Sequence, residues 1–149
     1  MKKKKYKKLG YVRNKYLEDL GIAPEECGTN FCNKNDKDWK KWKKQRRKYG
    51  FDVRETYSLD GIFYEWLYSR LTMYVEVASN VVDLEYHSFE YIPTGESEPK
   101  TITELEAINI IKDEAKRMIL QDNLDYINYK PFDENIMILF CKILPALWW

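Results

Sequence analysis

The clearest pattern in the chain is a run of apolar residues at steps of three and four from Leu59 to about residue 79. This spacing places apolar side chains on one side of an α-helix. Ser58 and Asp60 are the candidate N-cap residues. An apolar stripe of this length is more typical of a core helix than of a binding site. The members of the stripe are Leu59, Ile62, Phe63, Trp66, Leu67, Leu71, Tyr74, Val77 and Ala78.

Shorter helical patterns flank this helix on both sides. Residues 11–20 repeat apolar positions at helical spacing and stop at Gly21, and residues 37–48 follow Asp36 or Asp38 as cap and stop at Gly50.

Two more helices are expected in the C-terminal half. One runs to about Leu120 after a capping-box pattern, either Thr101 with Glu104 or Thr103 with Glu106, and the other runs from Glu134 to Leu144 after Asp133.

A small β-hairpin completes the expected fold. Residues 81–92, rich in Val, Tyr and Phe, predict a strand, the segment PTGESEP predicts a turn, and residues 100–102 predict a short return strand. The sequence therefore predicts a mainly α fold with a minor α+β character. We expect a single compact helical domain from residue 9 to 149, preceded by a basic flexible arm at residues 1–8. The terminal Trp148 and Trp149 are expected to seal the core.

Charge changes this picture, because the net charge of +1 hides a strong asymmetry. Residues 1–48 hold 17 Lys and Arg against 6 Asp and Glu, whereas residues 49–149 hold 8 against 18. The basic end favours a nucleic-acid or other acidic partner. The alternative is that the basic segment lies across the acidic part of the same chain.

The segment WKKWKKQRRK, residues 39–48, is the candidate binding surface. Lysine and arginine neutralise phosphates, and aromatic rings stack on bases. Tryptophans at helical spacing more often face a core. In that case the outward cations still bind the phosphate backbone of a nucleic acid, without recognising its base sequence. The candidate residues are Lys40, Lys41, Lys43, Lys44, Arg46, Arg47, Lys48, Trp39 and Trp42.

Catalytic motifs are scarce, since His87 is the only histidine and no Gly-rich phosphate loop, nucleophile elbow or HExxH occurs. On the predicted strand, Asp83, Glu85 and His87 would share one face, which suits a divalent metal in a nuclease with Asp60 or Glu65 completing the site. The alternative is a solvated strand face. Nearby, Asp52, Arg54, Glu55 and Asp60 form a charged cluster expected to order the start of the long helix through an Arg54–carboxylate bond.

Three cysteines and the histidine form one possible zinc set, Cys27, Cys32, Cys141 and His87. The alternative is a reduced loop pair, with Cys141 as a small core hydrophobe. No cofactor is expected. The longest apolar run, Ile136 to Phe140, is too short to span a bilayer and no signal peptide is visible, so no membrane partner is expected either.

Three segments, NFCNKNDKDWKKWKKQRRKYGFDVRETYSLDGIFYEWLYSRLTMYVEVA, VDLEYHSFEY and the terminal PALWW, resemble small accessory proteins of phages and prophages of Gram-positive bacteria. The resemblance runs from about residue 30 to the end. That group has no agreed activity, so the resemblance implies a setting, the cytoplasm of an infected bacterial host, and no catalytic residue.

The leading hypothesis is therefore a non-enzymatic protein that binds a host or phage nucleic acid or nucleoprotein, such as an inhibitor of a nucleic-acid-guided defence complex. A host protein is a further candidate partner. A metal-dependent nuclease built on Asp83, Glu85 and His87 is the first alternative. The second is a structural phage component that oligomerises through exposed aromatic residues.

Overall fold

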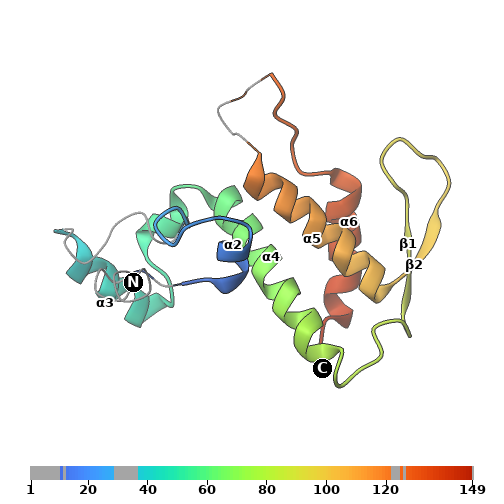
Figure 1. Ribbon diagram of the computed structural model, residues 1–149, viewed down its shortest axis with the longest axis horizontal. Helices are drawn as coiled ribbons and strands as arrows, with labels where there is room; N and C mark the ends of the chain where they lie inside the picture. Colours follow the sequence, from blue (N-terminus) through green and yellow to red (C-terminus); the bar gives the residue numbers. More distant parts are fainter. Residues whose placement is uncertain (1–10, 12, 29–36, 122–124, 126, 149) are drawn as a thin grey trace. The chain divides into compact units, whose positions relative to one another are not determined.

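The computed structural model describes residues 11, 13–28, 37–121, 125 and 127–148. The chain is mainly helical, with 56% helix, five α-helices in the described ranges and one two-stranded antiparallel hairpin (Figure 1). The predicted fold class is confirmed. The chain forms two compact units, residues 1–69 and 70–149, called here the N-terminal and C-terminal units. The single domain from residue 9 stays a prediction, and the basic arm lies outside the described residues.

The N-terminal unit begins with the short helix α2, Lys15–Asp19. The side-chain oxygen of Asn14 accepts hydrogen bonds from the backbone N–H groups of Tyr16 and Leu17, so the helix begins there and not at residue 11 as predicted. Gly21, with φ of +89°, follows the helix as the sequence predicts.

Helix α3, Trp39–Tyr49, follows with Asp38 at the N-cap position. Gly50 ends it in the left-handed conformation, with φ of +84°, and its N–H donates to the carbonyl of Arg46. A residue with a Cβ is strained at this φ, so glycine is the natural stop. A 3₁₀ helix, η1, Val53–Thr56, connects α3 to α4.

Helix α4, Leu59–Ala78, matches the prediction from the apolar stripe. Residues 59–69 belong to the N-terminal unit and residues 70–78 to the C-terminal unit. Leu67 and Leu71 are buried, but Leu59 is 67% exposed and Trp66 is 44% exposed. The stripe is therefore buried only in part.

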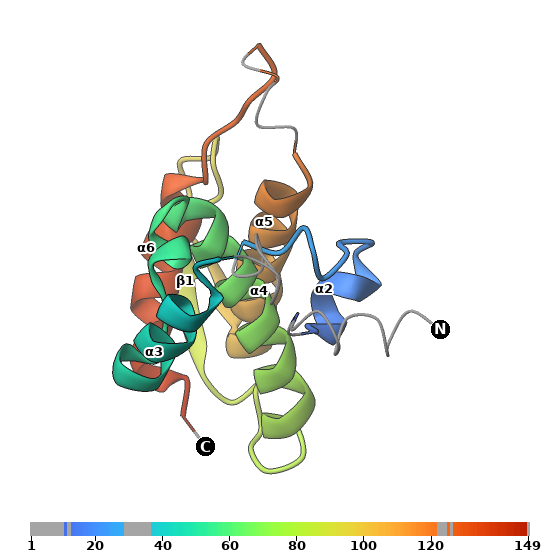
Figure 2. The same ribbon diagram turned by 90° about the vertical axis from the view of Figure 1, so that its left-hand side faces the viewer.

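The C-terminal unit is built on two paired helices, α5, Glu104–Leu120, and α6, Glu134–Ile143, which is followed by the 3₁₀ helix η2, Leu144–Ala146. They lie side by side in Figures 1 and 2. The predicted capping box of Thr103 and Glu106 starts α5, and Asp133 caps α6 as predicted. Their buried apolar residues are Ala107, Ile108, Ile111, Ala115, Met118, Leu139, Phe140 and Ile143.

The hairpin pairs β1, Ser88–Tyr91, with β2, Lys100–Thr103, in antiparallel register. The first strand is shorter than predicted, because the backbone of residues 81–87 forms hydrogen bonds with the ends of two helices and not with β2. Val81 and Val82 donate to the Ala78 carbonyl at the end of α4, and the carbonyls of Leu84 and His87 accept from the first residues of α5. Residues 81–87 are therefore a turn that connects α4 to β1, and its backbone is hydrogen-bonded to the end of α4 and to the start of α5.

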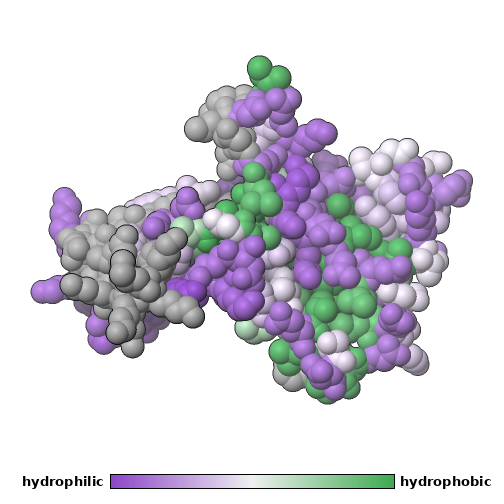
Figure 3. Space-filling model, in the orientation of Figure 1, coloured by the Kyte–Doolittle hydropathy of each residue, from purple (hydrophilic) through white to green (hydrophobic). Residues whose placement is uncertain are grey.

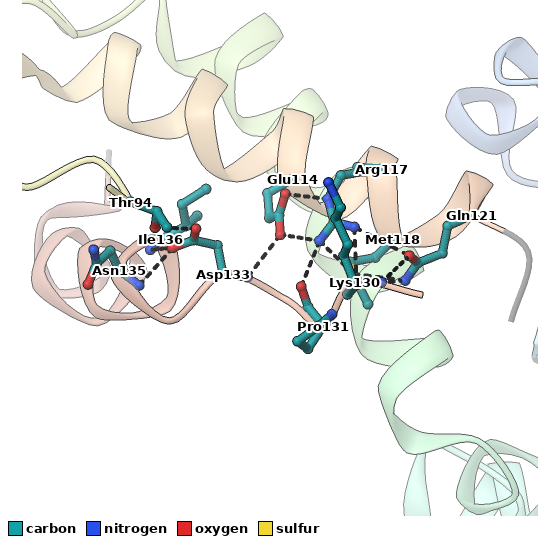
Figure 4. A network of polar contacts seen from close by, with 10 residues as sticks. All are labelled: Thr94, Glu114, Arg117, Met118, Gln121, Lys130, Pro131, Asp133, Asn135 and Ile136. Atoms are coloured by element: carbon teal, nitrogen blue, oxygen red, sulfur yellow. Dashed lines mark hydrogen bonds and ion pairs between the residues drawn. The ribbon is translucent and has the colours of Figure 1, made fainter. Parts of the chain in front are cut away.

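A polar cluster holds the residues before α6 against α5 (Figure 4). Arg117 donates to both carboxylate oxygens of Glu114, at 2.8 and 2.5 Å, and to the carbonyls of Lys130 and Pro131, at 3.1 and 2.8 Å. Glu114 also accepts from the backbone N–H of Asp133 at 2.9 Å. One ion pair thus fixes the segment that leads into α6.

Exposed apolar residues gather on the C-terminal unit. In Figure 3 they lie near the end of α4 and the end of the chain, while hydrophilic residues cover most of the rest of this face. Val81 is 65% exposed and Trp148 is 76% exposed. The expectation that Trp148 seals the core is wrong, and Trp149 lies outside the described residues.

Candidate nucleic-acid interface

The basic residues of α3 occupy one side of the helix. Because successive residues turn by about 100°, the six exposed cations fall within one arc of about 160°, which we call the basic face. The remaining arc of the helix holds its aromatic residues and two polar ones: Trp39, Trp42, Gln45, Arg46 and Tyr49. The basic face consists of Lys40, Lys41, Lys43, Lys44, Arg47 and Lys48.

The opposite side of α3 attaches the helix to η1, within the N-terminal unit. Trp42 is buried, and the guanidinium of Arg54 lies over its ring at 4.4 Å from the centroid. The amide of Val53 donates to the side-chain oxygen of Gln45 at 3.2 Å. Trp39 is half-buried. Trp42 was a candidate for contact with a partner, but in this position its ring cannot receive a base.

A buried charge network lies beneath α3. Asp52 is 1% exposed and accepts two hydrogen bonds from the side chain of Arg54, each at 2.8 Å, and one from Arg46. Arg46 also reaches Glu55 at 3.2 Å. The expected Arg54–carboxylate bond is confirmed. Arg46, predicted as part of the binding surface, instead serves this network, and Asp60 accepts from Ser58 in the first turn of α4.

These hydrogen bonds determine the ionisation of Asp52. Burial acts to raise its pKa, but the hydrogen bonds from Arg54 and Arg46 outweigh burial and lower the pKa to about 2. Asp52 is therefore charged at neutral pH. With Glu55 it balances the charges of Arg46 and Arg54, so this network adds no net charge beneath the basic face.

The cations of the basic face are not compensated in the same way. Among the residues that the structure describes, Lys40, Lys41, Lys43, Lys44 and Arg47 form no ion pair. A purely structural role exists for Arg47 and Lys48, since cations in the last turn interact favourably with the helix dipole. It does not account for the four lysines nearer the start.

Two exposed aromatic rings lie at the C-terminal end of α3. Tyr49 is 56% exposed and Phe51 is 48% exposed, with 6.3 Å between their ring centroids. The ammonium of Lys48 lies 4.9 Å from the centroid of Tyr49. Sequence reasoning considered Trp39 and Trp42 as the stacking residues and missed Phe51. The signal available was a pair of aromatics around a helix-ending glycine, directly after the basic run.

No protein family, curated protein or solved structure matches this chain. Within the described ranges, no helix has the length and apolar character needed to cross a bilayer.

The candidate nuclease residues do not share a strand face. Asp83, Glu85 and His87 precede β1, in a turn where the amide of Glu85 donates to the Asp83 side chain at 2.9 Å. The predicted strand placement is wrong, because α4 and α5 use the backbone of this segment. In the described part of the chain, no three His, Cys, Asp or Glu side chains are grouped so that they could hold a metal ion.

The candidate zinc set is described only in part, since Cys32 lies outside the described residues. Cys27 is buried in the N-terminal unit and its thiol contacts the Ala23 carbonyl at 3.6 Å. Cys141 is exposed on α6, so its expected role as a core hydrophobe is wrong. The four-ligand set stays a prediction.

The two described cysteines should differ sharply in reactivity. Burial, followed by the negative charges of Glu65, Glu18 and Glu26, raises the pKa of Cys27 to about 12. At pH 8 roughly one molecule in ten thousand then carries the thiolate, which is the reactive form. We expect iodoacetamide to label Cys141 in the folded protein and to leave Cys27 unmodified, as read by peptide mass spectrometry. Equal labelling rates would contradict this environment, and denatured protein labelled at both sites is the control.

Proposed function

We propose that this protein is a non-enzymatic binder of nucleic acid that contacts phosphates through the basic face of α3. One observation carries the proposal: six exposed cations share one side of a helix whose other side is fixed to the N-terminal unit. Such a surface binds the backbone of a nucleic acid without reading its sequence.

The size of the basic face sets the expected salt dependence. From Lys40 to Lys48 the helix rises by about 12 Å. Phosphates of one strand recur about every 3.4 Å along a duplex axis, so about three of them lie alongside. Each neutralised phosphate adds about −0.9 to the slope of log K against log salt, and three of them weaken binding about 40-fold between about 50 and 200 mM salt.

The proposal is tested by fluorescence anisotropy with labelled DNA and RNA at these two salt concentrations. In the test variant, Lys40, Lys41, Lys43, Lys44 and Arg47 are replaced by Gln, while Arg46 is kept because it belongs to the buried network. We expect wild type to bind with the steep slope, and the variant to lose most of the affinity at low salt together with most of the slope.

The matched control removes the same number of positive charges, five, from the C-terminal unit. Its substitutions to Gln are at Arg70, Lys100, Lys116, Lys130 and Lys142. This control should keep the slope of wild type if α3 is the site. An equal loss in both variants would mean that only net charge matters. Unchanged binding by the α3 variant would remove α3 as the site.

We extend the proposal to nucleoproteins, as the resemblance to phage accessory proteins favours. The C-terminal unit holds 14 Asp and Glu against 7 Lys and Arg, whereas the N-terminal unit holds 18 Lys and Arg against 10 Asp and Glu. A chain with such opposite charges suits a partner that presents both nucleic acid and a basic protein surface, because complementary charges steer the encounter. Inhibition of a host defence complex is the activity that this partner class implies.

A further inference from the structure

We propose that the ligand is single-stranded nucleic acid, and that Tyr49 and Phe51 are the residues on which its unpaired bases stack. The inference rests on the proposed function, because it assigns a substrate class to the same site. It adds a part of the surface that charge alone does not explain.

The backbone around these two rings is held on both sides. Tyr49 is the last residue of α3, and the cap bond from Gly50 to the Arg46 carbonyl closes that helix. Asp52, directly after Phe51, is buried in the network with Arg46 and Arg54. Phe51 therefore stands on a short segment fixed at each end, and its ring is exposed without a mobile backbone beneath it.

The rings are oriented so that they do not stack on each other. Their planes are tilted by 40° with centroids 6.3 Å apart, and each ring is about half exposed. Single exposed aromatics are common on protein surfaces and need no explanation. Here two adjacent rings lie at the C-terminal end of α3, where the ammonium of Lys48, a member of the basic face, is 4.9 Å from the centroid of Tyr49. Cations for the phosphates and rings for the bases are the combination that single-strand binding proteins use.

Stacking separates single strands from duplexes. In a duplex each base is already stacked between its neighbours, so exposed rings add little to phosphate contacts. An unpaired base can leave its neighbours and place its face on a ring, which strengthens binding on the order of 10-fold per ring. The basic face then supplies salt-dependent affinity for either form, and the rings supply the preference for the single strand.

The test compares oligo(dT) of about 12 nucleotides, within the ~4–16 nucleotide sites typical of single-strand binding, with a duplex of the same length. Two double variants of the chain are used. Tyr49→Leu with Phe51→Leu keeps apolar bulk and removes the π faces, whereas Tyr49→Phe with Phe51→Tyr keeps both rings. Circular dichroism confirms that each variant is folded. Tyr86→Leu, at a 79% exposed aromatic of the C-terminal unit, is the control.

We expect wild type and the aromatic-swap variant to bind oligo(dT) 10- to 100-fold more tightly than duplex, and the leucine variant to bind both with the affinity of wild type for duplex. Equal wild-type affinity for both forms, or a leucine variant with full preference, overturns the inference and leaves the proposed function standing. Salt-independent binding, or no binding to either probe at low salt, overturns both. Loss of preference in Tyr86→Leu would assign stacking to another surface and also overturn the inference.

Discussion

Replacing Asp52 with alanine is expected to lower the free energy of unfolding of the N-terminal unit by about 3–5 kcal/mol, the range found when one partner of a buried ion pair is removed. Asp52 and Arg54 are 1% and 3% exposed. Without the carboxylate, the Arg54 guanidinium stays charged and buried over Trp42, because arginine does not lose its proton at accessible pH. Urea unfolding followed by tryptophan fluorescence measures the loss.

Glu55→Ala is the matched control for this experiment. Glu55 also pairs with Arg46, at 3.2 Å, but both side chains are partly exposed, and such pairs contribute about 0–1 kcal/mol. If the Asp52 variant is no less stable than the Glu55 variant, the buried network does not hold α3. The basic face would then depend on the packing of Trp42 and on the hydrogen bond from the Val53 amide to Gln45.

Acid should reproduce the Asp52 effect without a mutation. The pKa of Asp52 is about 2 in the folded protein and 3.8 for the ordinary carboxyl group, so the folded state favours the charged form. The stability that this group contributes is fully present above the ordinary pKa and is lost as pH falls towards 2. The difference in unfolding free energy between wild type and Asp52→Asn should therefore shrink across this window.

Replacing Arg117 with alanine is the second change with a large expected effect, a loss of about 2–3 kcal/mol in the free energy of unfolding. This is the order of one hydrogen bond to a charged group, because the Arg117 side chain is 35% exposed and water compensates much of the remainder. The substitution leaves Glu114, 8% exposed, with the Asp133 amide (Figure 4). It also removes the Arg117 hydrogen bonds to the carbonyls of Pro131 and Lys130, of which the Lys130 carbonyl keeps the hydrogen bond from the Gln121 side chain at 3.2 Å. The hydrogen bonds from Arg117 are the main reason that the pKa of Glu114 is lowered. Hydrogen exchange at residues 133–137, together with urea unfolding, measures the result.

Two further variants separate charge from geometry at this site. Arg117→Lys keeps the positive charge but cannot donate to both carboxylate oxygens and two carbonyls in the same plane, so an intermediate loss is expected. Lys116→Ala, at the exposed neighbouring position, should change stability by about 0.5 kcal/mol or less. Full stability in the lysine variant would show that charge alone holds the segment before α6.

The sequence predicts the helices of this fold well where a local signal marks their ends. The Thr103–Glu106 capping box, the Asp133 cap and the glycines at 21 and 50 are such signals, and each is found in the structure. The Arg54–carboxylate bond was also predictable, because the two residues are only two positions apart.

The predictions from sequence are wrong where residues distant along the chain determine the local backbone hydrogen bonds or the burial of a side chain. Residues 81–87 have the composition of a strand, but the carbonyl of Ala78 and the amides at the start of α5 take their backbone hydrogen bonds. The exposure of Cys141 likewise follows from which side of α6 meets α5, and composition does not show this. At the candidate site, the cations of α3 were predicted, but the burial of Trp42 beneath Arg54 depends on contact with η1.

The hairpin has a consequence for how this protein tolerates change. A connection of eight residues joins β1 to β2, too long to dictate which residues pair, so the pairing must come from the strands themselves. Phe89 and Tyr91 point to the more buried side, with Phe89 opposite Ile102, and a shift by one residue would turn Glu90 inward instead. Beyond Thr94, whose hydroxyl donates to Asp133, a longer connection costs closure entropy that grows only slowly with its length. An insertion within one of the four-residue strands would instead shift the pairing and turn the buried side outward.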